Sequence, residues 1–327
     1  MSLSETIKRE ARALGFDAVG IATVDCILPA TLLQRLHVWL ANQYHGTMAW
    51  MARPPSRRAD PGLVLPGCRS IVSVAMTYNT DLGPNEGPGY GRIARYAWGK
   101  DYHLVLGERL RQLEEKIKLI RPDAATRLYV DTGPVMEKAW AQQAGIGWIG
   151  KHSNLVSSDH GSWLLLGEIL TTLELGADEP ATDLCGTCTL CIKACPTGAI
   201  VEPYVVDARR CISYVTIEHR GPEESIPDEL KSQMANHIFG CDDCLDVCPF
   251  NLRVVAQADA SFFPAEETRA PVLKDLAEMT REQFVRRFKD SPISRAKWEG
   301  LRRNVSIAQA NEARQHKAAS PLSSLAK

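Results

Sequence analysis

Residues 185–196 read Cys-Gly-Thr-Cys-Thr-Leu-Cys-Ile-Lys-Ala-Cys-Pro, and residues 241–249 read Cys-Asp-Asp-Cys-Leu-Asp-Val-Cys-Pro. A further cysteine, Cys211, lies between the two stretches. The spacing C-x2-C-x2-C-x3-C-P is typical of bacterial proteins with two [4Fe–4S] clusters, in which the fourth cysteine binds the other cluster. The sequence therefore predicts a ferredoxin-like region that carries two clusters and moves single electrons.

The second stretch lacks one ligand of the pattern. When its Cys-Pro end is aligned with that of the first, Ile238 stands where a cysteine is needed, and Cys211 is the nearby cysteine that can replace it. The swapped-ligand rule then divides eight thiolates into two sets of four without remainder. The first set is Cys185, Cys188, Cys191 and Cys248, and the second is Cys195, Cys211, Cys241 and Cys244.

Other uses of these cysteines fit the spacing less well. Structural zinc sites usually pair two C-x2-C units across a spacer, without a tight run that ends in Cys-Pro. Disulfides need an oxidising compartment, and the chain begins with a polar helical segment rather than a signal peptide. The remaining cysteines, Cys26 and Cys68, lie far upstream, where we expect small buried hydrophobic side chains.

Composition sets the broad class of the protein. A chain of 327 residues with 45% hydrophobic and 24% charged residues predicts about two soluble globular domains. No apolar run reaches the ~20 residues that span a bilayer, so we expect no membrane segment and a cytoplasmic location. We also expect a monomer, independently of this observation. The net charge is −1, but residues 281–327 contain eleven Lys and Arg against four Asp and Glu. That surface either binds phosphates or is a solvated helix face.

The order of predicted elements gives an α+β fold with three regions. Residues 1–176 mix strands, at 18–24, 71–78 and 127–131, with helices at 102–120 and 135–144, and form the catalytic domain. Segments 154–157 and 163–173 are predicted to pair as strands about the turn at 158–161. Residues 177–255 form the cluster region, and residues 256–327 form a basic helical tail with a disordered end.

Glycine-rich residues 145–150 match two nucleotide-binding patterns only superficially. Gly145, Gly147 and Gly150 fit G-x-G-x-x-G, but a helix rather than a strand precedes them. A P-loop would need Ser or Thr where His152 stands. We expect instead a tight helix-to-strand turn that a cofactor or substrate approaches closely. The stretch from Asp101 to Gly107 is likewise only a near match to a cobalamin-binding signature and does not indicate a cobalt ligand.

Asp131 is the candidate proton donor. It ends a predicted strand and enters the turn Asp131-Thr132-Gly133-Pro134, and catalytic groups often occupy such loop positions. A carboxyl group desolvated there by a cofactor would have a raised pKa and could donate a proton. The alternative, which the sequence alone favours, is that Asp131 caps the following helix.

Five stretches together resemble the epoxyqueuosine reductases, which are cobalamin and iron–sulfur enzymes of tRNA modification. They extend the likeness over about residues 5–310, at 95–103, 130–138, 145–151, 183–188 and 240–244. The resemblance implies a nitroreductase-like α/β domain that binds cobalamin, followed by a ferredoxin-like domain. It also implies the two-electron removal of the epoxide oxygen from epoxyqueuosine at the wobble position of tRNA.

The resemblance further assigns residues and partners. Asp131 aligns with the general acid of the family, and the positions that align with its cobalamin contacts are Arg58, Asp131, His152, Leu155, Leu166 and Ser213. The implied partners are a tRNA anticodon stem-loop with a G-U-N anticodon, held in part by the basic tail, and an external low-potential reductant. Two alternatives stay open, namely a small-molecule enzyme like the reductive dehalogenases and an electron-transfer ferredoxin without enzymatic activity.

Overall fold

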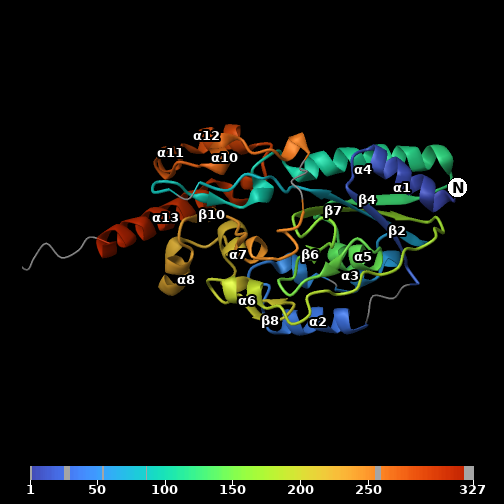
Figure 1. Cartoon of the computed structure of the whole chain (residues 1–327), viewed down its shortest axis with the longest axis horizontal. Coiled ribbons are helices and arrows are strands. Elements are labelled where there is room, and N and C mark those ends of the chain that lie inside the picture. Colours follow the sequence, from blue (N-terminus) through green and yellow to red (C-terminus); the bar gives the residue numbers. More distant parts are fainter. Residues whose placement is uncertain (1, 26–29, 54, 86, 255–258, 320–327) are drawn as a thin grey trace, which may run out of the picture.

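The computed structural model describes residues 2–25, 30–53, 55–85, 87–254 and 259–319; Cys26 and the end of the tail lie outside these ranges. Its centre is an antiparallel four-stranded sheet in the order β1-β2-β7-β4 (Figure 1). The strands are β1 (Ala18–Thr23), β2 (Ser70–Thr77), β4 (Thr126–Tyr129) and β7 (Leu164–Thr171). All eight residues of β2 are buried, because this strand has neighbours on both edges and helices over both faces.

Helices cover both faces of this sheet. Helices α1 (Leu3–Ala13) and α4 (Tyr102–Ile120) pack on one face, and α5 (Glu137–Gln143) packs on the other (Figure 1). The buried residues of α4 recur every three or four positions, at Leu106, Leu110, Leu113 and Ile117, as expected of an amphipathic helix on a core. The strands and helices predicted around these elements are confirmed to within two residues at each end.

The predicted strand pair about residues 158–161 is wrong. The short strand β6 (Leu155–Val156) pairs with β5 (Trp148–Ile149), and only one bridge, between Ser157 and Gly161, closes the turn. Strand β7 pairs along its length with β2 instead and along its end with β4. The long apolar run of β7 gains more by lying in the centre of the sheet than by forming a hairpin with a two-residue strand.

The glycines at 145–150 form the predicted helix-to-strand turn, and the close approach of a cofactor or substrate to them stays a prediction. Gly145 ends α5 with φ +76°, and a Cβ there would lie 2.6 Å from the carbonyl oxygen of Glu179. A Cβ on Gly147 would lie 2.2 Å from the carbonyl oxygen of Val156. These two glycines are therefore needed because the chain packs against its own backbone.

The cysteine-rich region consists of short elements that lie to the left of α5 in Figure 1, toward the tail. Its elements are α6 (Leu190–Ala194), β8 (Ile200–Glu202), β9 (Val205–Val206), α7 (Ile212–Ile217), α8 (Asp228–Gln233), β10 (His237–Phe239) and α9 (Asp243–Asp246). The upstream elements α2 (Ala30–Ala41), α3 (Pro55–Ala59) and β3 (Arg92–Ile93) complete the first region.

The tail packs on both earlier regions. Its helices are α10 (Glu266–Arg269), α11 (Leu273–Glu278), α12 (Arg281–Phe288) and α13 (Lys297–Ala319). One hydrophobic cluster joins Ile93 and Trp98 of the first region, Phe239 of the second, and Leu276 and Val305 of the tail. The pairing of β10 with β3 is parallel and also crosses the predicted boundary at residue 176. The three regions thus share cores, although each is continuous in sequence.

Candidate active site

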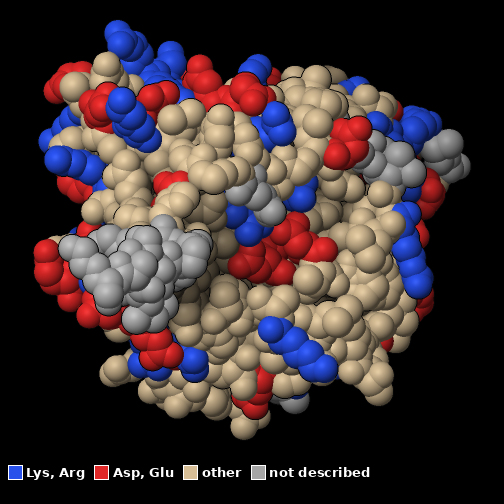
Figure 2. All heavy atoms as spheres, turned by 60° about the vertical axis from the view of Figure 1, so that its left-hand side comes forward, with Lys and Arg blue, Asp and Glu red and all other residues tan. Residues whose placement is uncertain are grey.

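A cavity of about 1290 Å³ opens between α3, α4, the loop after β4, α7 and residues 292–297. Its walls include Arg53, Arg57, Arg58, Tyr96, Asp101, Tyr102, His103, Asp131, Lys138, Ser213, Glu218, Arg295 and Lys297. The face drawn in Figure 2 is hollowed near its centre, where acidic side chains gather with basic ones beside them. The volume exceeds the ~300–1,000 Å³ of common small-molecule sites, so the cavity suits a large cofactor together with a substrate.

Asp131 stands on the wall of this cavity at the end of β4. Its φ is +58°, a left-handed conformation that few residues other than glycine adopt, and its side chain is 60% exposed. The carboxylate accepts a hydrogen bond from the Tyr102 hydroxyl at 2.9 Å. Helix α5 begins after Met136 without a side-chain cap, so the alternative role of Asp131 as its cap is wrong.

His103 connects Asp131 to a second carboxylate. Its Nε2 lies 3.4 Å from Asp131 Oδ2, and its Nδ1 lies 2.7 Å from Asp101 Oδ1. Asp101 also caps α4, because its carboxylate accepts the backbone N–H of His103. Burial alone would lower the pKa of His103, but the hydrogen bonds and charges of the two carboxylates raise this pKa to about 9.

The protonation states follow from this arrangement. Although burial acts to raise it, hydrogen bonds from His103 and Tyr102 hold the pKa of Asp131 below its usual value. At neutral pH the proton therefore resides on His103, and its partner Asp131, which lines the same cavity, is ionised. The raised pKa expected from the sequence concerns a carboxyl group desolvated by a bound cofactor, and it stays a prediction. Among the described residues, the cationic His103 beside the carboxylate acts in the opposite direction and lowers the pKa of Asp131.

A second carboxyl group holds the backbone of Asp131. The Asp131 N–H donates to Glu137 Oε1 at 2.6 Å. Behind Glu137 lies Glu168 of β7, whose side chain is fully buried. Burial and the neighbouring charge raise the pKa of both glutamates. Glu168 was not predicted, although a single acidic residue in the apolar run of residues 164–170 was a signal that could have identified it.

The structure brings three of the six predicted cofactor contacts to the cavity. Arg58, Asp131 and Ser213 line it, and the Arg58 guanidinium lies over the Trp50 ring at 5.5 Å. Leu155 and Leu166 belong instead to a small hydrophobic cluster beneath α5, and His152 is 5% exposed. Burial lowers the pKa of His152 to about 4, and its Nε2 has no hydrogen-bond partner among the described residues.

The charges of neighbouring cysteines contribute to the pKa shifts of Cys191 and Cys244, and the division of the eight cysteines into two ligand sets stays a prediction. Besides burial, the charges of Cys185, Cys188 and Cys248 raise the pKa of Cys191. Burial raises the pKa of Cys244, and the charges of Cys211 and Cys195 add to this effect. The first group adjoins Trp148, whose Nε1 donates to Cys185 Sγ at 3.4 Å. Four converging thiols of this kind form a donor set suited to a [4Fe–4S] cluster.

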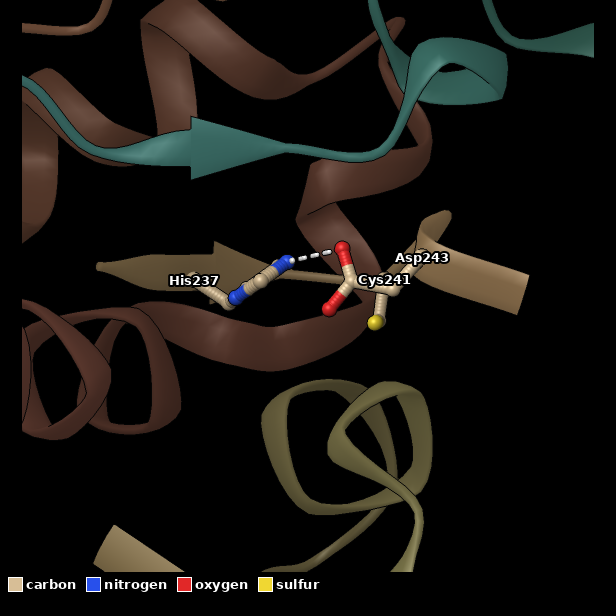
Figure 3. A group of neighbouring side chains, drawn as sticks. All are labelled: His237, Cys241 and Asp243. Atoms are coloured by element: carbon tan, nitrogen blue, oxygen red, sulfur yellow. Dashed lines mark hydrogen bonds and ion pairs between the residues drawn. The ribbon is translucent and has the colours of Figure 1, made fainter. Parts of the chain in front are cut away.

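Cys241 also has a histidine and an aspartate beside it. Figure 3 shows His237, Cys241 and Asp243 together, with potential ligand atoms all within 4.8 Å of one another. His237 and Asp243 pair directly, since His237 Nε2 lies 3.2 Å from Asp243 Oδ1. Cys241 belongs to the second cysteine group, so His237 and Asp243 surround that group rather than form a separate site.

The basic tail divides into two parts. Arg295 and Lys297 are exposed and line the cavity. Arg303, in contrast, is buried and donates hydrogen bonds to the backbone oxygens of Val215, His219 and Gly221. The expectation that residues 281–327 present one basic surface is therefore wrong for Arg303, which ties α13 to the segment after α7. Among the described residues, no helix is long and apolar enough to cross a membrane.

Two family models match parts of this chain. Residues 184–251 match a "4Fe-4S double cluster binding domain", and residues 58–132 match a family described as "Epoxyqueuosine reductase QueG, DUF1730". The first match covers all eight cysteines of the two groups. The second covers the segment from Arg58 to Asp131 and its neighbour Thr132, and therefore includes Tyr102 and His103.

Relatives of known description match nearly the whole chain. An epoxyqueuosine reductase of Gloeobacter violaceus is 48% identical over 92% of this chain and 94% of its own length. One of Escherichia coli is 41% identical over 94% of this chain and 81% of its own.

Solved structures agree with the sequence matches. An epoxyqueuosine reductase crystallised with an epoxyqueuosine-modified tRNA-Tyr stem loop has a TM-score of 0.86 at 33% identity, covering 95% of this chain and 81% of that one. A Bacillus subtilis epoxyqueuosine reductase, solved with its catalytic aspartate loop swung out of the active site, has a TM-score of 0.86 at 32% identity, covering 95% and 82%. This chain belongs to the epoxyqueuosine reductase family.

Proposed function

We propose that this protein reduces epoxyqueuosine to queuosine at the wobble position of tRNA. The reaction removes the epoxide oxygen as water, consumes two electrons and two protons, and leaves a carbon–carbon double bond. The observation that carries the proposal is the ionised Asp131 on the cavity wall, paired at 3.4 Å with protonated His103 on the same wall. A ferredoxin that only carries electrons has no use for such a proton donor.

The cavity and the cysteines have the composition that the cofactors need. Arg58 and Ser213 would hold the polar edge of cobalamin, and the two groups of four cysteines would each hold a [4Fe–4S] cluster. The buried Nε2 of His152, which has no hydrogen-bond partner among the described residues, is a further polar atom near this region. When bound, these groups supply the two electrons of the reduction.

The protein's own residues supply one of the two protons, and solvent supplies the other. Tyr102 and His103 fix the Asp131 carboxylate by hydrogen bonding to it, and Asp101 orients His103 through Nδ1. We propose that the proton on His103 passes to the departing epoxide oxygen through Asp131, which faces the cavity. In this scheme Asp131 is not itself the store of the proton, as a carboxylic acid with a raised pKa would be. The imidazole of His103 holds the proton, and the Asp131 carboxylate passes it on.

Exposed cations at the cavity rim would hold the RNA. Arg53 and Arg57 lie on one side of the cavity, and Arg295 and Lys297 lie on another. We propose that they contact phosphates of an anticodon stem-loop with a G-U-N anticodon, while the modified base enters the cavity. We further propose a cytoplasmic monomer that takes electrons from an external low-potential reductant.

The domain division is part of the same proposal. Residues 1–176 would form a nitroreductase-like cobalamin-binding domain, residues 177–255 a ferredoxin-like domain, and residues 256–327 a helical tail. The shared hydrophobic cluster that includes Ile93, Phe239 and Val305 supports a fixed arrangement of the three.

Mass spectrometry of nucleosides tests the reaction. Epoxyqueuosine-containing tRNA is incubated anaerobically with the reconstituted protein and a low-potential reductant, with and without cobalamin. Removal of one oxygen from the modified base that depends on cobalamin is the expected result. If protein that contains cobalt and both clusters leaves the base unchanged, the proposal is wrong, and small-molecule reduction becomes the better interpretation.

A further inference from the structure

The backbone N–H of Asp131, a residue in an unfavourable backbone conformation, is held by one side chain among the described residues. Its φ of +58° lies in the left-handed region, which aspartate tolerates better than most residues but does not prefer. The only hydrogen bond found for its N–H among the described residues goes to Glu137 Oε1, at 2.6 Å. The contact crosses from the first turn of α5 to the loop that carries the proton-transmitting carboxylate.

A fully buried carboxyl group lies behind Glu137. Glu168 is 0% exposed, and no described residue donates a hydrogen bond to either of its carboxyl oxygens; the side chain that acts on it is the carboxyl group of Glu137. It stands opposite Tyr129 in β4 and opposite Ser73 in β2, on the sheet face that α5 covers. An ionised carboxylate without partners is too costly to bury, so Glu168 retains its proton.

The surroundings of the two glutamates set which one is charged. Asp131, Glu168 and Lys138 act on Glu137, and Arg58 and Tyr102 lie near enough to interact with its charge. The groups that act on Glu168 are Glu137 and Asp131. Glu137 is partly exposed, adjoins two cations and accepts an N–H, so it is the member of the pair that ionises first.

We propose that protonated Glu168 and ionised Glu137 form an acid–base pair that holds the Asp131 loop in its active position. Glu168 donates its proton in a hydrogen bond to Glu137, and Glu137 accepts the Asp131 N–H. Protonation of Glu137 weakens the second bond and releases the loop. Glu137 and Glu168 are thus positioning residues, and this role rests on the proposed function of Asp131.

The pair makes the loop sensitive to pH in a defined direction. The raised pKa of Glu137 places its titration above the usual range of a glutamate. The loop is therefore held at alkaline pH and released as the pH falls, and the two glutamates titrate together rather than singly. A purely structural contact would show no such dependence.

Hydrogen–deuterium exchange of the peptide covering residues 128–135 tests the pair without reference to catalysis. Protein with both clusters is studied anaerobically between about pH 5.5 and 8.5, with rates corrected for intrinsic exchange. In the unaltered protein, protection of this peptide falls as the pH decreases. In Glu137→Ala, exchange at alkaline pH is at least about tenfold faster, as expected when a hydrogen bond to a charged group is removed.

Two substitutions at Glu168 separate the proton-donor role from packing. Glu168→Gln keeps a hydrogen-bond donor and preserves both the protection and its midpoint. Glu168→Leu removes the donor and moves the midpoint to higher pH. The control is Glu174→Gln, because Glu174 is exposed and lies just beyond the same strand. This substitution changes neither the protection of the peptide nor its midpoint. If Glu168→Leu does not fold, exchange in Glu137→Ala and Glu137→Gln is compared with that in the unaltered protein. This comparison still tests whether the Glu137 carboxylate holds the Asp131 loop.

The outcomes distinguish this inference from the proposed function. If exchange at residues 128–135 is unchanged in Glu137→Ala while the protein reduces epoxyqueuosine, the pair is not what holds the loop. If exchange responds as expected but no variant or parent reduces epoxyqueuosine, the loop contact stands and the proposed reaction fails. If Glu168→Gln alters the midpoint as much as Glu168→Leu, Glu168 does not act by donating its proton.

Discussion

The second cysteine group and the Asp131 cavity adjoin each other, since Ser213 on the cavity wall is two residues from Cys211. They are built in different ways. The eight cysteines fall within residues 185–248, whereas the cavity collects side chains from Met48 to Lys297. Thiolate ligands need little more than correct spacing on a short chain, but a proton donor needs neighbours that set its pKa. The comparison teaches that a local motif reveals a metal centre, whereas a proton path emerges only from the fold.

The largest effect should come from breaking a cysteine group. We expect Cys211→Ala to lose about half of the bound iron and all measurable turnover, because Cys211 belongs to only one of the two sets. Iron and sulfide analysis after anaerobic reconstitution measures this. Cys68→Ala is the matched control, since Cys68 is buried far from both groups and should leave the iron content unchanged. Full iron content in Cys211→Ala would mean that the ligand assignment is wrong.

The next effect concerns the group that faces the cavity. Asp131→Asn should lower turnover by about 10²–10⁴-fold, the range typical of removing a general acid or base. Asparagine tolerates positive φ, so the loop conformation and the N–H contact to Glu137 should persist. Iron and corrinoid content should stay at the level of the unaltered protein. Asp159→Asn, in an exposed turn, is the control. Unchanged turnover in Asp131→Asn would remove Asp131 from the proton path.

A smaller effect tests where the proton is stored. Because neighbouring carboxylates raise the pKa of His103 to about 9, this side chain is protonated below that pH and loses its proton above it. Turnover of the unaltered protein should therefore fall as the pH rises through about 9. His103→Gln should be about 10–100-fold slower and lack this alkaline decline. His160→Gln, in the turn at 158–161, should retain it. An alkaline decline that survives in His103→Gln would assign it to another group.

These variants also mark what the sequence could and could not predict. The α+β class, the main strands and helices, and the division of cysteines into two sets all follow from local spacing and periodicity. The direction of the Asp131 pKa shift does not, because it depends on His103, which lies 28 positions away in sequence. The roles of Glu137 and Glu168 likewise depend on β4, β7 and α5 meeting at one point.

Charge counting failed in a similar way in the tail. The sequence contains seven more basic than acidic residues over 281–327, but it does not show which cations reach solvent. Arg303 bonds to backbone oxygens and cannot reach RNA, whereas Arg295 and Lys297 stand at the cavity rim. Net charge is the sum over a segment, and only packing decides how that sum is distributed over the surface.

The smallest expected effect is on tRNA binding, and it separates the cations at the cavity rim from the other cations of the tail. We expect the double variant Arg295→Gln with Lys297→Gln to bind tRNA several-fold more weakly. The slope of log affinity against log salt should become shallower by about 0.7 for each phosphate that the variant no longer neutralises. The matched control is Arg286→Gln with Lys289→Gln, which removes the same charge from α12 and its C-terminal end, away from the cavity wall. Filter binding at several salt concentrations measures both the affinity and its salt dependence.

If the two double variants weaken binding equally, the RNA responds to the total charge of the tail. Weakening confined to the Arg295 and Lys297 variant would instead place the RNA at the mouth of the cavity, where Asp131 could reach the modified base.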